Sequence, residues 1–179
     1  MNAATAEAER FISMYRQQVY QTIDLVSPVP SANYTITPVD NEQMFMGSRV
    51  NRINIGTLLR HLIIAESHWF SHLAQIQPGD TIPIPQNASE VAGIADGRPL
   101  TDKLLEVCGA GIDTVASLSA GQLTTEFVFV GRRFSVMGFL WSLFAHHAYH
   151  KGQIDQLMRE LGQLPMEYME YREKQAVIG

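Results

Sequence analysis

Four long stretches of the sequence repeat apolar residues at the spacing of an α-helix, and no other feature constrains the fold as strongly. The first covers residues 3–26, where apolar or aromatic side chains recur every three or four positions and no Gly or Pro intervenes before Pro28. The second begins after Asn54, a residue type that caps helix N-termini well, and runs until Pro78. Both stretches therefore predict amphipathic helices with one face in a core.

The third stretch covers residues 101–118, and Thr101 is the expected N-cap. Gly109 and Gly111 weaken this prediction, because each disfavours a helix by about 1 kcal/mol relative to Ala. The side chains expected to face the core of the protein are Leu104, Leu105, Val107, Cys108, Ile112 and Val115.

A short β-hairpin is predicted before the last helix. Residues 124–136 alternate apolar and polar side chains on both sides of Gly131, as two paired strands would. Ser135 then caps a fourth helix over residues 136–161, which Gly162 ends. Four long helices without a run of regular strands predict an all-α protein, and the obvious architecture is a four-helix bundle.

Two connections between the predicted helices are rich in Pro, Gly, Asn and Asp, over residues 28–54 and 78–100. The first is long for a compact domain, and such loops often cover functional sites. We therefore consider the 28–54 loop and the 126–134 arm as candidate walls of a pocket. A length of 179 residues suits one domain, so residues 1–179 are predicted to form a single unit.

Composition excludes several classes of protein. Thirteen Lys and Arg residues against 18 Asp and Glu give a net charge of -5, which disfavours a nucleic-acid partner. One cysteine, Cys108, excludes an internal disulfide or a Cys-rich zinc module, and we expect it to be a small buried thiol. The N-terminal residues do not resemble a secretory signal, and no apolar stretch is long enough to span a membrane. We expect a soluble cytoplasmic protein.

The histidines carry most of the functional information. All six lie in two short windows of the sequence, which contain His61, His68 and His72 in the second helix and His146, His147 and His150 in the fourth. Chance predicts roughly 0.16 pairs with the spacing H-x3-H, counted against that template. Two such pairs are present, His68/His72 and His146/His150.

This spacing suits metal binding, because side chains four residues apart on a helix project from one face and two imidazoles can reach the same ion. A third histidine from a facing helix would complete a three-histidine site with an open position for water or substrate. His61, His68 and His72 lie within about 20° of one stripe but spread over about 16 Å along it. Either one level of the stripe or the His68/His72 pair could therefore supply ligands, and the spacing leaves both alternatives open.

The neighbouring polar residues receive other predictions. His147 points about 100° away from His146, so we expect a partly exposed side chain rather than a ligand of the same ion. Glu66 points about 140° from His61, and we expect it to be solvated or in a salt bridge. Gln153 lies about 20° from the direction of His146 and could hydrogen-bond a ligand or substrate, or could pack between helices.

Two stretches, NIGTLLRHLIIAESHW and FLWSLFAHHAYHKGQI, resemble the DinB-like, or YfiT-like, superfamily of metal-dependent hydrolases. The second is similar to the H-x3-H-[RK]-G-Q-I ending of that family, and MRELGQLPMEYMEY is similar to its C-terminal stretch. Carried over by position, the resemblance implies that the metal ligands are His61, His146 and His150. It also implies that His68 and His72 are bystanders.

The resemblance further implies a bundle with up-down-down-up helices, commonly dimeric, and a divalent metal ion. Imidazole ligands suit zinc or nickel, and also iron. The better-understood members of this superfamily look like thiol-dependent transferases or isomerases, which use low-molecular-weight thiols such as bacillithiol, mycothiol or glutathione. We therefore expect a metal-dependent thiol S-transferase or hydrolase that acts on a small molecule and forms a homodimer. The alternatives are a non-catalytic metal-binding or stress-associated protein, and a helical dimer with histidines at its interface.

Overall fold

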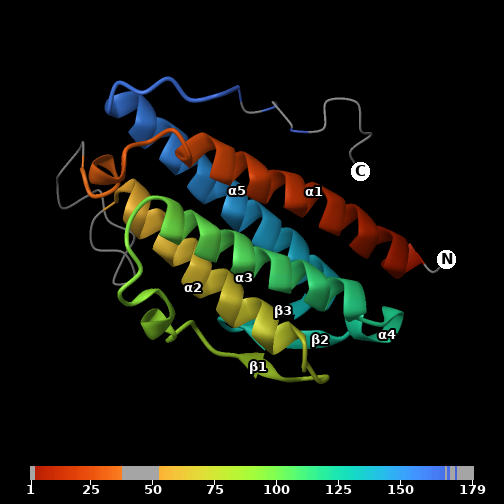
Figure 1. Cartoon of the computed structure of the whole chain (residues 1–179). Helices are drawn as coiled ribbons and strands as arrows, with labels where there is room; N and C mark the ends of the chain where they lie inside the picture. Colours follow the sequence, from red (N-terminus) through yellow and green to blue (C-terminus); the bar gives the residue numbers. More distant parts are fainter. Residues whose placement is uncertain (1–2, 38–52, 168, 170–171, 173–179) are drawn as a thin grey trace.

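The computed structural model describes residues 3–37, 53–167, 169 and 172. Within this part of the chain, four long helices lie side by side, namely α1 (Ala3–Val26), α2 (Ile55–Leu73), α3 (Arg98–Ser117) and α5 (Val136–Glu160). Helices α1 and α5 run in one direction and α2 and α3 run in the other (Figure 1). The predicted all-α fold and the up-down-down-up order are therefore confirmed.

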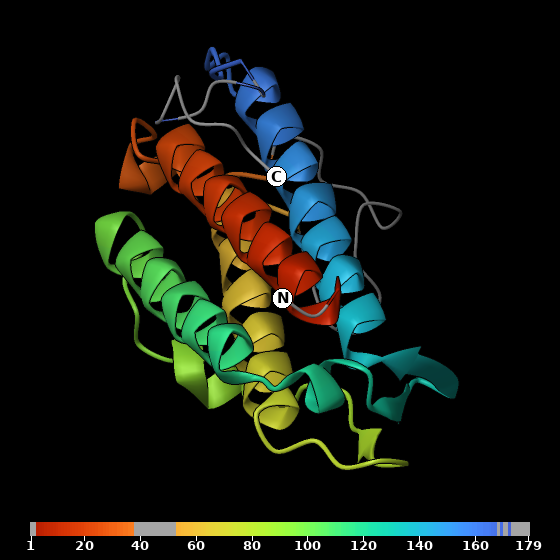
Figure 2. The same cartoon turned by 90° about the vertical axis from the view of Figure 1, so that its right-hand side faces the viewer.

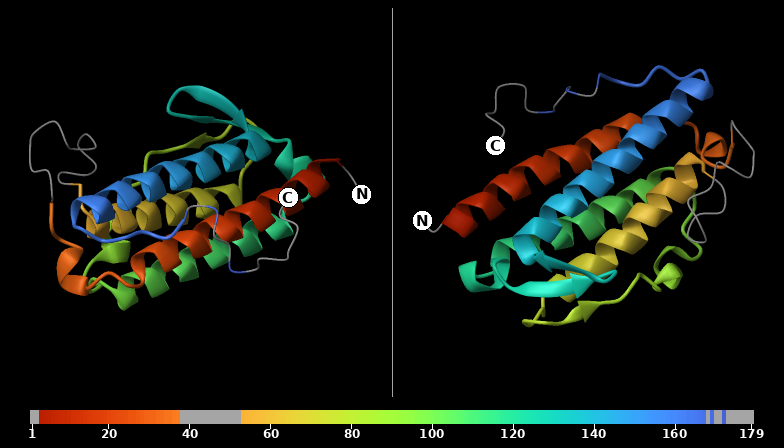
Figure 3. Two further views of the ribbon diagram at one scale, coloured as in Figure 1. Left: turned by 90° about the horizontal axis from the view of Figure 1, so that it is seen from above. Right: turned by 180° about the vertical axis from the view of Figure 1, so that it is seen from behind.

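The order of the helices around the bundle brings α2 and α5 together. Helix α5 lies between α1 and α2, and α3 packs against α1 and α2 on the other side (Figure 3). Because α2 and α3 are parallel neighbours, no tight turn can join them, and residues 74–97 cross back along the bundle. The crossover contains β1 (Thr81–Ile82) and the 3-10 helix η3 (Ala88–Val91). Another short helical turn, η1 (Ser31–Asn33), follows α1, and α4 (Ala120–Leu123) follows α3.

A small sheet lies at one end of the bundle, where α5 begins (Figure 2). The predicted hairpin is present as β2 (Glu126–Phe129) and β3 (Arg132–Ser135), which pair antiparallel. Val130 and Gly131 form its two-residue turn with φ values of 50° and 70°, the left-handed conformation that such hairpin turns require. Strand β1 adds a parallel partner to β2, which was not predicted, because two residues are too few to show an alternating pattern.

Helix α2 begins as predicted and ends earlier. The Asn54 side chain accepts a hydrogen bond from the Thr57 backbone N–H, and the Thr57 hydroxyl accepts one from the Asn54 N–H. This reciprocal capping box holds the turn that precedes His61. The helix ends at Leu73 rather than continuing to Pro78.

The predicted start of α3 was wrong by four residues, because Gly97 rather than Thr101 is the N-cap. Gly97, with φ at 87°, precedes the helix, and Pro99 lies in its first turn, where a missing N–H costs nothing. Thr101 is inside the helix instead of capping it, and its hydroxyl donates to the Arg98 carbonyl. Leu105 was also predicted to face the core but is 40% exposed, because it lies at the open edge between α3 and α1, where it lines a shallow hollow with Val19 and Tyr20.

Helices α2 and α3 approach closely at Gly111. A Cβ atom added to this glycine would lie 2.2 Å from Cδ2 of Phe70, far inside the contact distance of two carbon atoms. The Phe70 ring in turn packs edge-on against the Tyr15 ring of α1, with centroids 5.7 Å apart. None of the helices in the described ranges is long and apolar enough to cross a membrane.

Candidate metal centre

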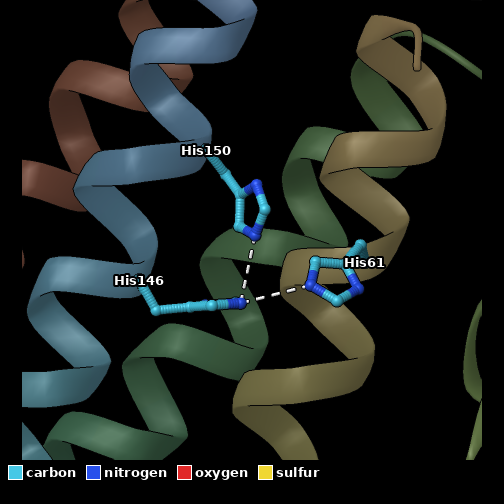
Figure 4. Close-up of side chains that lie close together, drawn as sticks. All are labelled: His61, His146 and His150. Carbon is cyan, nitrogen blue, oxygen red and sulfur yellow. Dashed lines mark hydrogen bonds between the residues drawn. The ribbon is translucent and has the colours of Figure 1, made fainter. Parts of the chain in front are cut away.

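The structure brings together one histidine from α2 and two from α5. His61 points from α2 toward His146 and His150, which lie one turn apart on α5 (Figure 4). The Nε2 atom of His146 is 3.2 Å from Nε2 of His61 and 3.1 Å from Nε2 of His150. One ring nitrogen from each of the three residues lies within 4.8 Å of the other two. The geometry thus brings His61, not His68 or His72, to the pair on α5.

The distances between these nitrogens suit a shared ion. Zinc binds imidazole nitrogen at about 2.0–2.1 Å, which places tetrahedral ligand atoms about 3.3 Å apart. The observed separations of 3.2 and 3.1 Å are close to this value. The three residues therefore fit the donor set that a divalent ion of the zinc, nickel or iron type accepts.

Gln153 fixes the orientation and tautomer of His150. Nδ1 of His150 donates to the side-chain oxygen of Gln153 over 2.7 Å. Since that oxygen can only accept, the proton of the neutral ring is on Nδ1 and the lone pair is on Nε2, the atom that faces His146. The Gln153 amide nitrogen donates to the hydroxyl of Tyr149 over 3.3 Å. Tyr149 is 60% exposed, so this chain of hydrogen bonds runs from the cluster to the surface.

His146 is held in its neutral form. Its pKa is lowered to about 3, mainly by burial and also by the nearby His150 and His61. The Trp69 ring packs edge-on against it, with centroids 4.9 Å apart, and Trp69 also packs against Phe129 of β2. The 126–134 arm therefore reaches the aromatic side of the cluster. A neutral imidazole is the form that binds metal ions.

The other histidine pair lies elsewhere. Nε2 of His68 is 2.8 Å from the Pro83 carbonyl oxygen of the crossover, and Nδ1 of His72 is 2.7 Å from the His68 carbonyl oxygen. Their rings contact each other with centroids 4.2 Å apart. The structure does not bring them to the cluster formed by His61. His68 bonds α2 to the crossover, and His72 contacts only His68 on the same helix in the interactions described.

The prediction for His147 was wrong, and so was one of the two alternatives for Glu66. His147 was predicted to be partly exposed and Glu66 was a candidate for a solvated side chain, but both are fully buried. Helix α5 is covered by α1 as well as by α2, so a residue 100° from His146 still faces the core. The alternative prediction for Glu66, a salt bridge, is confirmed, because its Oε1 lies 2.7 Å from Nδ1 of His147.

Glu66 is the centre of a buried hydrogen-bond network. Its Oε2 accepts hydrogen bonds from the Tyr15 hydroxyl at 2.5 Å and from the Cys108 thiol at 2.9 Å. Burial alone would raise the pKa of Glu66, but the charge and hydrogen bond of His147 lower it, with help from the other two donors. Burial and the Glu66 charge raise the pKa of Cys108 well above its usual value, so the thiol stays protonated. The prediction of a buried Cys108 is confirmed.

This network also offers three ligand types, from Glu66, Cys108 and His147. The separations of their polar atoms nevertheless differ from those of the histidine cluster. Contacts of 2.7 and 2.9 Å are hydrogen-bond lengths and are shorter than the spacing of ligands around an ion, about 3.3 Å. The histidine cluster is therefore the better candidate for a metal ion. Of the predicted 28–54 loop, residues 38–52 lie outside the described residues.

Comparisons with known proteins agree with this fold. YfiT from Bacillus subtilis, described as "a probable metal-dependent hydrolase with an unusual four-helix bundle topology", superposes with a TM-score of 0.69. The alignment covers 88% of this chain and 89% of YfiT at 13% identity. The DinB-like protein YjoA from Bacillus subtilis gives a TM-score of 0.61 at 13% identity, over 93% of this chain and 99% of YjoA. No curated protein matches the chain significantly.

The family of the chain is identified from its sequence. The profile of the DinB family matches residues 14–176, which include all four long helices of the bundle except the first turns of α1. The chain therefore belongs to the DinB family.

Proposed function

We propose that the protein is a metal-dependent enzyme that acts on a small molecule, by thiol S-transfer or by hydrolysis, with His61, His146 and His150 as the ligands of one divalent ion. The observation that carries the proposal is the convergence of three Nε2 atoms, with separations of 3.1 and 3.2 Å between neighbours. The description of YfiT as a probable metal-dependent hydrolase supports it, since YfiT has the same fold.

Three protein ligands leave coordination positions for an exogenous group, as in catalytic rather than structural sites. A divalent ion at such a site lowers the pKa of a bound water or thiol, which supplies a nucleophile near neutral pH. The surrounding residues prepare the histidines for this role. Gln153 holds the His150 tautomer, and burial beside Trp69 keeps His146 neutral. Zinc or nickel is the proposed ion, and iron is also compatible with imidazole ligands.

The ligand assignment is tested by metal analysis of purified variants. The parent chain should retain close to one divalent ion, and His61→Ala, His146→Ala and His150→Ala should each lose most of it. His68→Ala and His72→Ala are matched controls, because they remove histidines from α2, the helix that carries His61. Both variants should retain the ion. Equal loss from His68→Ala would show that the ion is bound at another level of α2.

The reaction is tested separately. The metal-loaded protein is incubated with an electrophilic small molecule and a panel of low-molecular-weight thiols, and also with ester or amide substrates without thiol. Turnover that requires His61 and depends on the thiol identifies a transferase, whereas thiol-independent turnover identifies a hydrolase. An ion that is retained without any turnover of these substrates would favour the non-catalytic metal-binding alternative.

A further inference from the structure

We infer that Glu66 and His147 are positioning residues, whose hydrogen bond sets the rotation of α5 against α2 and thereby the distance of His61 from His146 and His150. The two residues are fully buried and joined by a contact of 2.7 Å between Oε1 and Nδ1. The inference rests on the proposed function, because it assigns this bond a role in holding the ligands of the ion.

The placement of the pair carries the inference. Glu66 lies on α2, as His61 does, and His147 follows His146 on α5. The bond therefore joins the two helices that bring the histidines together, on the side that faces the core. Because a helix moves as a rigid body, a rotation of α5 that lengthened this bond would displace His146 and His150 together. Metal and catalytic sites need their ligand atoms held within about 0.5 Å of the positions that the bound ion or the reaction requires.

Both partners of the bond are themselves fixed by the other two helices. Tyr15 of α1 and Cys108 of α3 donate to the second oxygen of Glu66, so the carboxylate cannot turn. On the far edge of the His147 ring, Nε2 is 2.8 Å from the Thr22 hydroxyl. That hydroxyl donates its proton to the Gln18 carbonyl oxygen, so it accepts the hydrogen bond from Nε2–H of His147. All four long helices thus contribute to one network that holds the ring at both edges.

A purely structural role explains this arrangement less well. A buried ion pair loses the hydration of both charges, and apolar side chains of similar volume often stabilise a fold as much or more. Apolar contacts, however, tolerate rotation and sliding, whereas a hydrogen bond has a defined length and direction. A directional contact directly behind the three histidines is what a site with strict ligand geometry requires.

The test uses Co²⁺ as the probe, with the dissociation constant and the visible ligand-field spectrum as readouts. Glu66→Leu removes the bond and should weaken Co²⁺ binding about 10- to 100-fold and shift the spectrum. Glu66→Gln keeps an acceptor oxygen for Nδ1 and should restore both readouts to within a few-fold of the parent. Leu100→Ala is the control for general destabilisation. This substitution leaves a cavity at a fully buried position of α3, a helix that carries none of the three proposed ligands. It should lower the melting temperature without changing Co²⁺ binding.

His147→Phe is measured in the same way, because it keeps a planar ring but makes no hydrogen bond, and it tests the inference if Glu66→Leu does not fold. A folded Glu66→Leu or His147→Phe protein with the parental constant and spectrum would overturn the inference. So would two ions per chain that require Cys108, since the network would then be a second site. A parent chain that binds no Co²⁺, or binds it without His61, would overturn the proposed function as well.

Discussion

The proton on Nδ1 of His150 is held by the side-chain oxygen of Gln153, 2.7 Å away. The ring is therefore fixed in one tautomer in the metal-free protein. Its lone pair is on Nε2, which lies 3.1 Å from Nε2 of His146. A free histidine would have to select this tautomer and orientation on binding. Gln153 removes that cost through one contact on the same helix, three residues away.

Removal of this contact should weaken metal binding. We expect Gln153→Leu to reduce the affinity for Zn²⁺ or Ni²⁺ by about 10- to 100-fold, the usual effect of losing a partner of a ligating histidine. Gln153→Glu keeps an acceptor and should bind at least as tightly as the parent. Titration calorimetry measures both, and Gln156→Leu, at an exposed position of α5, is the matched control. Equal affinity in Gln153→Leu and the parent would contradict this role.

The stability of the metal-free protein should fall on mild acidification. The pKa of His146 is lowered to about 3 in the folded protein, whereas its ordinary value is 6.5. Between these values the unfolded chain binds a proton that the folded protein does not, so the free energy of unfolding decreases as the pH falls. One such proton contributes up to about 1.4 kcal/mol per pH unit. Urea unfolding in the presence of a chelator measures the effect.

His146→Gln isolates this contribution. The stability that Glu66 gains from its lowered pKa is present above its ordinary value of 4.5 and is lost only at lower pH. The interval from pH 6.5 to 4.5 therefore reports on histidines. The variant should show a shallower slope than the parent in that interval, and an unchanged slope would mean that His146 is not the group that resists protonation.

Two glycines of α3 should respond to alanine in opposite directions. A methyl group at Gly109 meets nothing within 4 Å, so Gly109→Ala should stabilise the protein by up to about 1 kcal/mol through helix propensity. A methyl group at Gly111 would lie 2.2 Å from the Phe70 ring, so Gly111→Ala should destabilise by about 1–3 kcal/mol despite the same gain in propensity. Denaturant unfolding of both variants measures the difference, and a stabilised Gly111→Ala would show that Phe70 moves aside freely.

Local patterns predicted the helices and the hairpin well. The caps at Asn54 and Ser135 depend on side chains that bond within three residues, so they can be recognised without tertiary structure. The α3 start was wrong because Thr101 has the right residue type but the wrong neighbours, with Pro99 already helical. Strand β1 exists only through its pairing with β2, which no local pattern encodes.

The site was predicted in part. The spacing of His146 and His150 identified one pair, but the choice of His61 over His68 came from family resemblance. Helical periodicity gives directions on one helix and cannot say what faces another helix across the bundle. For the same reason Glu66 and His147 were not recognised as partners. A signal was available, since a charged residue within the apolar stripe of α2 needs a buried partner.

The position of α5 between α1 and α2 has a consequence for how the chain folds. The first and last helices of the bundle are neighbours, so their contacts join residues more than a hundred positions apart. The consecutive helices α1 and α2 lie diagonally across the bundle, as do α3 and α5, so contacts between long helices are on average longer-range than in a bundle built from consecutive hairpins. Long-range contacts slow folding, and we expect slower kinetics than for such a bundle. During synthesis on the ribosome, His61 is therefore made 85 residues before His146, and the histidine cluster can form only after most of α5 has been added.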